Sequence, residues 1–353
     1  MQRRLATPPR SGFVQPYAQA GLRKSAQPLS FTLGTMSRQF TVENCQFGFL
    51  RAQFDAAYRF KGGDWDHFAF DGPLLAHYTN LKGLVGIVES GGFWLSDFRF
   101  LNDTEEYFNG CRMAKEVISG IASRPRHKNF SPILHNATKR LSEHPSKTYF
   151  VCSFSSLLDS LEQWRGYASS HDAVAMVFQN KPRLQLSHFT VMPILAPQKV
   201  IYDDSVKRQR LLRVIAKYSM EFRKDLAHGH PVDEDDWAQE LASGLSLEFM
   251  IFKNRAFAAE QEIRLVVSES HLKHFGDIKH RVCGGRIIPY VCSSDLYNES
   301  FFEHYGCNKL PITEIRVGPT ANQAITIDSV KVFLANNGYF NVPITPSAVP
   351  YRG

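Results

Sequence analysis

The chain has 353 residues, of which 43% are hydrophobic and 21% are charged, so it can form one large domain or two smaller ones. It contains no apolar run near the roughly 18 residues that a membrane span requires, and we expect no membrane partner. The net charge of +7 is concentrated in residues 1–40, which carry six basic residues and no acidic residue. The remainder is nearly neutral, which excludes a nucleic-acid footprint over the whole surface.

Residues 1–40 are rich in Pro, Ser, Gln and Arg and lack periodicity, which predicts a disordered basic tail. This composition weakly resembles a transit peptide, and Met36 equally fits a later start of translation. We expect residues 41–353 to form a single domain. None of the six cysteines forms a CxxC pair, which indicates reduced thiols in a cytoplasmic protein.

The first predicted elements follow the tail. Leu50, Phe54 and Tyr58 are four residues apart, as on one face of a short helix. Residues 74–79 predict a strand, and residues 81–90 predict a helix with Asn80 as its N-cap and Gly91 after its C-terminus. A short strand at 93–97 and a helix opening at 102–106 come next.

Further along, strands are predicted at 148–153, 173–178, 262–267, 286–291 and 314–317, and residues 191–202 are extended. Helices are predicted at 157–167, at 327–335 and, in two pieces divided at 228–231, across 205–256. This mixed order favours an α+β fold over a doubly wound parallel one. We expect a split, mostly antiparallel sheet with flanking helices and a helical insertion at about 205–256.

Several familiar sites are absent from the sequence. It contains no GxGxxG after a strand, no GxxxxGK[ST], no HExxH and no GxSxG. Dinucleotide-binding Rossmann, P-loop, zinc-protease and α/β-hydrolase interpretations therefore lose support.

Three segments concentrate polar side chains at strand ends. His77, Tyr78 and Thr79 close the first strand, although a strand-end histidine is often satisfied by backbone. The second segment joins a Ser-Phe-Ser strand end to two aromatics around an arginine, a pattern that suits a planar or anionic ligand but also a core helix. Its candidate residues are Ser153, Ser155, Trp164, Arg165 and Tyr167.

The third segment is Glu260-Gln261-Glu262-Ile263-Arg264. Residues two apart on a strand share a face, so the two glutamates and the arginine are predicted to point the same way. An exposed edge with alternating charges is the plain alternative. Asp97 and Asp103 are interpreted mainly as turn and capping residues.

Such a set suits cleavage of an N-glycosidic bond. Loss of nicotinamide from NAD leaves a ribosyl cation, which a carboxylate beside the ribose stabilises. An imidazole can hold the ribose, an aromatic ring can stack on nicotinamide, and arginine can bind pyrophosphate. This chemistry requires no metal.

The same segments resemble the bacterial family catalogued as domain of unknown function 2971 (DUF2971), from about Leu74 to the C-terminus. The resemblance is carried by residues 75–79, 94–97 with 101–103, 153–155 with 163–167, 260–266, 315–319 and 346–352. The opening His-x-Thr strand and the late glutamate strand are in turn similar to the ADP-ribosyltransferase superfold.

The resemblance implies a role for each candidate. Glu262 would be catalytic, and Glu260 would select or activate the acceptor. His77 and Thr79 would bind NAD, and Ser153 and Ser155 would line the middle strand. Tyr78, Trp164, Arg165, Tyr167 and Arg264 complete the predicted NAD-binding set, of which Arg165 and Arg264 come from charge and position.

The leading hypothesis is an ADP-ribosyltransferase-like enzyme that uses NAD to modify a macromolecule, protein or nucleic acid, or that hydrolyses NAD. The resemblance associates it with phage defence or toxins. A non-catalytic nucleotide-binding sensor and an interaction module are the alternatives. A magnesium nuclease using Asp97, Asp103 and Glu262 is a weaker third.

Overall fold

The computed structural model describes residues 72–101, 104–141, 147–167, 172–179, 197–269, 277–296 and 309–350. The chain divides into two units, Met1–Asn44 and Cys45–Gly353, and every described residue belongs to the second. The predicted tail and the helix predicted within 41–73 lie outside the described residues. No helix in the described ranges is both long and apolar enough to cross a bilayer.

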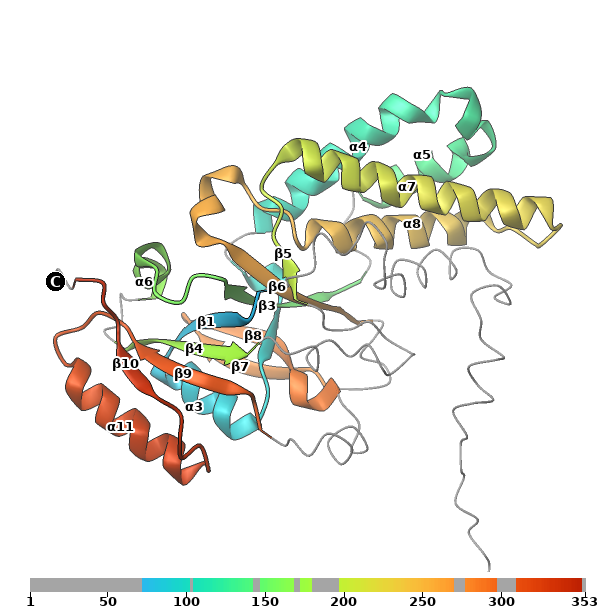
Figure 1. Ribbon diagram of the computed structural model, residues 1–353. Coiled ribbons are helices and arrows are strands. Elements are labelled where there is room, and N and C mark those ends of the chain that lie inside the picture. Colours follow the sequence, from blue (N-terminus) through green and yellow to red (C-terminus); the bar gives the residue numbers. More distant parts are fainter. Residues whose placement is uncertain are drawn as a thin grey trace, which may run out of the picture. The chain divides into compact units, whose positions relative to one another are not determined.

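A ten-stranded sheet forms the centre of the second unit (Figure 1). Its strands run in the order β10-β9-β4-β1-β3-β2-β8-β7, and β6 pairs with β3 and β5. All pairs are antiparallel except β10 with β9. The strands are β1 (Leu74–Asn80), β2 (Trp94–Asp97), β3 (Tyr149–Ser155), β4 (Ala173–Gln179), β5 (Gln198–Lys199), β6 (Glu262–Ser268), β7 (Lys279–Cys283), β8 (Arg286–Cys292), β9 (Ile312–Val317) and β10 (Ile344–Pro346).

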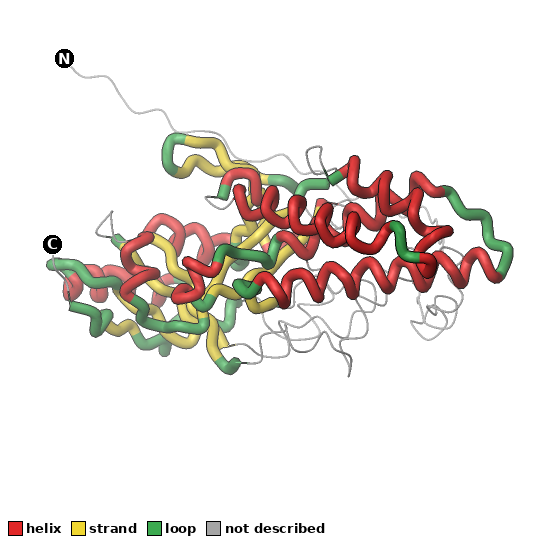
Figure 2. Tube along the Cα trace, turned by 90° about the horizontal axis from the view of Figure 1, so that it is seen from above, coloured by secondary structure: helices red, strands yellow, loops and turns green. Residues whose placement is uncertain are grey.

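One face of the sheet is covered by a helical layer. It consists of α4 (Thr104–Ala122), α5 (Ser131–Arg140), α7 (Asp204–Ala227) and α8 (Glu234–Phe249), which lie side by side in Figures 1 and 2. Their apolar stripes, including Trp237, Leu241 and Phe249 of α8, form one core with Tyr149 and Val151 of β3. The two helices predicted across 205–256 are therefore confirmed, and their inner stripe is core.

The opposite face carries a second core, under α3 (Leu81–Ser90) and α11 (Gln323–Asn336). Helix α3 begins and ends as predicted. The Asn80 side chain accepts a hydrogen bond from the Gly83 amide, and Gly91 adopts φ 65° after the last turn. Helix α6 (Leu161–Tyr167) lies on the same face as the helical layer, where Trp164 packs against Ala76 and Tyr78 of β1.

The predicted α+β class with a mostly antiparallel sheet is confirmed. The sheet divides at β3. One edge of β3 pairs with β6 along its whole length. Two strands share the other edge of β3. Strand β1 pairs with it at Ser155, and β2 pairs with it at Phe150 and Val151. Between them, no described strand pairs with residues 152–154 on this edge.

Candidate functional site

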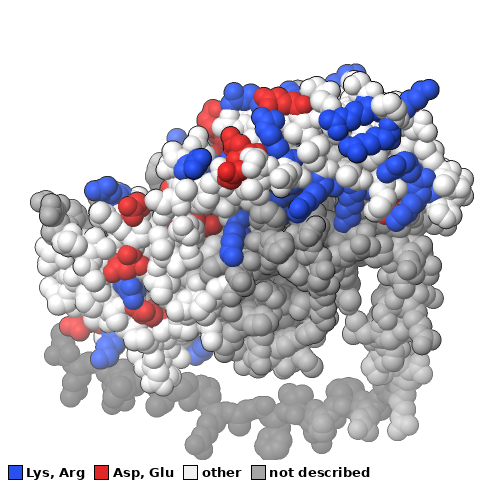
Figure 3. Space-filling model, turned by 45° about the horizontal axis from the view of Figure 1, so that its top comes forward, with Lys and Arg blue, Asp and Glu red and all other residues white. Residues whose placement is uncertain are grey.

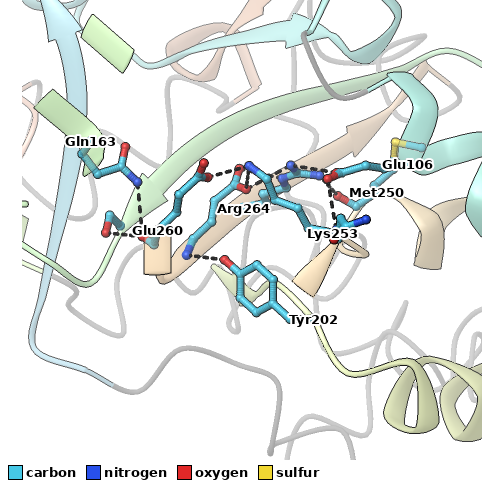
Figure 4. Close-up of polar contacts among 10 residues, drawn as sticks. Glu106, Gln163, Tyr202, Met250, Lys253, Glu260 and Arg264 are labelled. Carbon is cyan, nitrogen blue, oxygen red and sulfur yellow. Dashed lines mark hydrogen bonds and ion pairs between the residues drawn. The ribbon is translucent and has the colours of Figure 1, made fainter. Parts of the chain in front are cut away.

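A buried network of charges occupies the start of β6, on the face covered by the helical layer (Figure 4). Glu262 and Arg264 are only 6% and 4% exposed. The network also contains Glu106 from α4, Lys253 from the segment after α8, and Glu260. The predicted sharing of a face by Glu262 and Arg264 is confirmed, whereas an exposed charged edge is wrong, because both side chains are buried beside β3.

Arg264 is held at all three nitrogens of its guanidinium group. Its Nε donates to Glu262 Oε1 at 2.7 Å and its Nη2 to Glu262 Oε2 at 3.0 Å, a two-pronged pair. Its Nη1 donates to the Met250 carbonyl at 2.8 Å, and Nη2 lies 3.5 Å from Glu106 Oε2. Arg264 therefore fastens β6 to the end of α8 and to α4.

Lys253 joins the two predicted catalytic glutamates. Its Nζ donates to Glu260 Oε2 at 2.6 Å and to Glu262 Oε2 at 2.9 Å. Glu260 itself does not lie on the strand, since Gln261 adopts a left-handed φ of 47° that ends the short 3₁₀ helix Arg255–Glu260. The prediction that Glu260 belongs to the strand face is therefore wrong, although its carboxylate still reaches the same cation.

Glu262 is ionised in this setting. Burial alone would raise its pKa, but the charges of Arg264 and Lys253 and hydrogen bonds from Arg264 and Ser153 outweigh burial and hold the pKa at about 2. The Tyr202 hydroxyl accepts a hydrogen bond from the Glu262 amide at 2.9 Å, and burial raises the pKa of Tyr202 to about 12. The carboxylate therefore has the charge that oxocarbenium stabilisation requires, but two cations already neutralise it.

The middle-strand serines lie next to the network. The Ser153 hydroxyl hydrogen-bonds to the Glu262 carboxylate. The Ser155 hydroxyl donates to the Glu260 carbonyl at 2.8 Å and accepts from the Leu157 amide at 3.0 Å. Gln163 of α6 donates to the same Glu260 carbonyl at 3.2 Å. Ser155 therefore fixes the chain before β6 and closes the turn after β3.

Trp164 lies in the core and does not line the ligand pocket predicted around it. Trp164 is fully buried, its ring lies 4.8 Å from that of Tyr78, and its indole nitrogen donates to Asp159 at 2.6 Å. Tyr78 is likewise held, donating to the Leu157 carbonyl and accepting from the Ser160 amide. Arg165 is exposed, and the Tyr167 side chain lies outside the described residues. Trp164 and Tyr78 are therefore core residues that anchor α6.

His77 and Thr79 lie on the other face of the sheet. Ala76 pairs with Ser155 and Ser155 with Glu262, so Ala76 shares the Glu262 face and His77, one residue further, does not. His77 packs instead near Phe93 and Phe154 of the opposite core. The roles predicted for His77 and Glu262 require both to contact one NAD molecule, but the two side chains lie on opposite faces of the sheet.

The His77 ring is neutral at physiological pH. Its Nδ1 donates to the Ser153 carbonyl at 2.8 Å. Burial lowers its pKa to about 4, the Ser153 bond opposes this shift, and the charge of Arg281 adds to it. Thr79 lies against α3, where its hydroxyl occupies the space that a Cβ on Gly83 would need.

A cavity of about 340 Å³ borders the charge network. It lies between α4, the first turn of α7 and the segment after α8, and Lys253 and Glu106 belong to both its wall and the network. The lining residues are Glu106, Asn109, Gly110, Arg112, Met113, Glu116, Asp204, Lys207, Arg208, Phe252, Lys253, Asn254 and Arg255. No pattern in the sequence predicted this cavity, because its walls come from three distant segments and Lys253 is an isolated charge beside an apolar run.

The described residues contain no cluster of side chains suited to a metal ion. Among the residues described, no three His, Cys, Asp or Glu side chains are grouped so that they could hold a metal ion. Asp97 is paired with Arg99 through two hydrogen bonds from Nε, at 3.0 and 3.1 Å, and Asp103 lies outside the described residues. Asp97 and Glu262 are thus both paired with basic side chains, and the magnesium site that also requires Asp103 stays a prediction.

Comparison with known protein families gives a match over part of the chain. Residues 163–265 match the sequence model of a family described as "Protein of unknown function (DUF2971)". This range runs from Gln163 through α7 and α8 to Leu265, and so contains Glu260, Glu262 and Arg264 but neither His77 nor the middle-strand serines. No curated protein and no solved structure matches the chain. The resemblance of this chain to the DUF2971 family is thus confirmed over residues 163–265.

Proposed function

We propose that the chain is a nucleotide-binding protein, and that a phosphate-bearing ligand, NAD or a fragment of it, occupies the cavity beside the Glu262 network. The observation that carries the proposal is this cavity of about 340 Å³, lined by charged side chains, with the buried network as its inner wall. Its volume lies within the range of small-molecule sites, at roughly 300–1,000 Å³.

The charge of the lining favours an anion. Five cationic residues face three carboxylates, and Figure 3 shows further Lys and Arg side chains over the helical layer. Lys207 pairs with Asp204 at 2.8 Å and Arg208 with Glu116 at 2.6 Å. Arg112 and Arg255 have no ion pair with any described residue, although Arg112 donates a hydrogen bond to Asn109, so both cations can still bind phosphate oxygens.

The inner wall supports a binding role rather than a purely structural one. Buried ion pairs add little net stability, because each charge must be removed from water, and apolar residues of similar size often serve better. Two carboxylates, Glu106 and Glu262, and two cations, Lys253 and Arg264, are nonetheless buried together beside the cavity. A buried carboxylate with a strongly shifted pKa, such as Glu262, is typical of functional sites.

ADP-ribosyl transfer is the second candidate, favoured by the ionised Glu262 carboxylate. In that reaction the C1′–N bond breaks, nicotinamide leaves with the electron pair, and a nucleophile of the acceptor, or water, forms the new bond to C1′. Lys253 stands between the cavity and Glu262, so the sugar would reach the carboxylate only after this lysine moves. The association with phage defence or toxins rests on the resemblance and belongs to this candidate.

Calorimetric titration of the full chain with NAD and with ADP-ribose tests the binding proposal. We expect saturable binding that weakens at least tenfold in Arg112→Ala/Arg255→Ala. Arg286→Ala, an exposed arginine on β8 away from the cavity, is the matched control and keeps wild-type affinity. No binding by the wild type, or equal loss in both variants, would refute it.

Release of nicotinamide from labelled NAD separates the two candidates. A sensor binds NAD and releases no nicotinamide. An enzyme releases nicotinamide and loses this activity in Glu262→Gln while keeping its affinity for ADP-ribose. Turnover that is equal in the wild type and Glu262→Gln would exclude Glu262 as the catalytic carboxylate.

A further inference from the structure

Three exposed arginines gather at one end of the helical layer, where the short 3₁₀ helix η3 (Pro125–Phe130) follows α4 and packs on α7. Arg124 and Arg126 flank Pro125 at the start of η3, and Arg223 lies in the last turns of α7. Figure 3 shows Lys and Arg side chains gathered over this layer. The three arginines share no residue with the cavity beside the Glu262 network.

The buried ring of His127 joins the two segments. Arg126 Nε donates to His127 Nε2 at 2.9 Å, and His127 Nδ1 lies 3.4 Å from the Ser219 hydroxyl of α7. Arg223 Nε donates to the Ser219 carbonyl at 3.2 Å. The His127 amide donates to the Arg124 carbonyl at 2.8 Å. One network of hydrogen bonds therefore holds the three arginines next to each other.

The guanidinium groups are fixed at one nitrogen and open at the others. Arg124 Nε donates to the Gly120 carbonyl at 3.1 Å, as Nε does in Arg126 and Arg223 to their own acceptors. In the described ranges, the Nη groups of the three side chains have no acceptor. An arginine that is already positioned in this way loses less conformational entropy when it binds an anion.

Nearby carboxylates do not neutralise the cluster. Glu116 of α4 pairs with Arg208 at 2.6 Å, and Glu221 of α7 pairs with Lys224 at 2.7 Å. None of the three arginines forms an ion pair with a carboxylate of the described segments. Their positive charge is therefore unbalanced at this end of the layer.

The pKa of His127 is consistent with this unbalanced charge. Burial lowers it, and the charges of Arg126, Arg223 and Arg124 lower it further. The ring therefore stays neutral at physiological pH, with Nε2 as the acceptor for Arg126.

The absence of stacking side chains favours a double-stranded polyanion. Proteins that bind single-stranded nucleic acids place bases on aromatic rings. The exposed aromatic side chains of the described ranges, Phe108, Phe257 and Phe340, lie elsewhere, at the start of α4 and after α8 and α11. A duplex presents one phosphate charge per about 1.7 Å of its axis, so adjacent guanidinium groups can each meet a phosphate.

We propose that Arg124, Arg126 and Arg223 form a docking surface for the phosphate backbone of a double-stranded nucleic acid. Their free Nη groups donate to phosphate oxygens, and His127 and the Ser219 and Gly120 carbonyls hold the guanidinium groups in place. Phosphate contacts of this kind carry no sequence information, so binding is independent of base sequence. A footprint confined to one end of the helical layer agrees with the near-neutral charge of the rest of the chain outside residues 1–40.

The salt dependence of duplex binding by the full chain tests this proposal. Fluorescence anisotropy with a labelled DNA duplex of mixed sequence gives Kd at several salt concentrations. Each phosphate that the protein neutralises contributes about 0.9 to the slope of log Kd against log salt. We expect Arg124→Gln/Arg126→Gln/Arg223→Gln to lose about 2.7 of this slope and to bind at least tenfold more weakly at low salt. Arg223→Gln alone, which keeps η3 intact, is expected to lose about 0.9.

A second triple variant controls for total charge. Lys82→Gln/Arg286→Gln/Lys331→Gln removes the same charge from exposed positions on α3, β8 and α11, and is expected to keep the wild-type slope. The six basic residues within 1–40 are present in every variant and do not affect the difference. Circular dichroism and an unchanged affinity for NAD show that each variant is folded.

Three results would overturn the proposal. The first is an equal slope for the two triple variants, or no duplex binding by the wild type. The second is tighter binding of the single strand than of the duplex. The third is arginine-dependent binding to phosphatidylserine vesicles without binding to the duplex, which would assign the surface to a membrane.

Discussion

His77 and Glu262 lie on opposite faces of one sheet, although β3 is a neighbour of both of their strands. The pairings Ala76 with Ser155 and Ser155 with Glu262 fix this relationship, because directly opposed residues share a face and successive residues alternate. A single ligand therefore does not contact both side chains across one gap. The two groups therefore belong to separate regions of the molecule.

Glu262→Gln is expected to destabilise the protein strongly. The substitution keeps the shape of the side chain but leaves the buried charges of Arg264 and Lys253 without their shared carboxylate. Removal of one partner from a buried ion pair costs about 3–5 kcal/mol. Urea unfolding followed by circular dichroism measures the change.

Glu116→Gln is the matched control for this loss. Glu116 pairs with Arg208 at the surface, where the side chains are 60% and 46% exposed. A surface pair contributes about 0–1 kcal/mol, so Glu116→Gln remains near wild-type stability. Equal losses of stability in the two variants would show that Glu262 is not needed to neutralise the buried charges of Arg264 and Lys253.

His77 makes stability depend on pH. Its pKa falls from 6.5 to about 4 in the folded chain, so between these values the unfolded chain binds a proton that the folded chain does not. Stability therefore decreases as pH falls from 6.5 toward 4. At pH 5 this proton uptake by the unfolded chain lowers the free energy of unfolding by about 2 kcal/mol relative to its value above pH 6.5. We expect His77→Gln to flatten the stability curve over this range in urea unfolding, and a curve parallel to the wild type would contradict the neutral, buried imidazole.

Gly83→Ala should destabilise α3. A Cβ at Gly83 would stand 2.1 Å from the Thr79 hydroxyl, whereas a Cβ at Gly120 of α4 would meet nothing within 4 Å. We expect a cost of about 1–3 kcal/mol at Gly83 and a gain of about 0.5–1 kcal/mol at Gly120. In the Thr79→Ala background, Gly83→Ala should cost less stability. Thermal unfolding of Gly83→Ala, Gly120→Ala, Thr79→Ala and the double variant Thr79→Ala/Gly83→Ala measures these differences. Full additivity of Thr79→Ala and Gly83→Ala would exclude the contact.

Trp164→Ala and Arg165→Ala are expected to separate core from surface. Trp164 is fully buried, and the loss of such a ring costs about 3–5 kcal/mol. Arg165 is exposed, and its removal should change stability by less than about 0.5 kcal/mol. Affinity for NAD at a temperature where both variants are folded should be unchanged. A selective loss of NAD binding in Arg165→Ala would restore the predicted site on α6.

Much of the fold could be predicted from local signals. The Asn80 and Gly91 caps bounded α3, and the glycine and proline near 228–231 separated α7 from α8, because capping and helix breaking depend on neighbouring residues only. Helix α5 and strands β7 and β10 were not predicted, since short or exposed elements carry weak periodicity. Strand β7 in particular is largely exposed and alternates little.

The site was less predictable because it depends on pairing between distant strands. Alternation placed Glu262 and Arg264 on one face correctly, since both lie on the same strand. It could not relate that face to the face of His77, because this requires the register of β1 and β6 on β3. Lys253 carried no local signal, and its role follows only from the approach of the segment after α8 to β6.

The crystal structure of the full chain with ADP-ribose bound is the most direct test of the proposed binding site. The account predicts the diphosphate in the cavity between α4, α7 and residues 252–255, with Arg112 or Arg255 donating to its oxygens. A ligand bound elsewhere with this cavity filled only by water, or no ligand at saturating concentration, would contradict it.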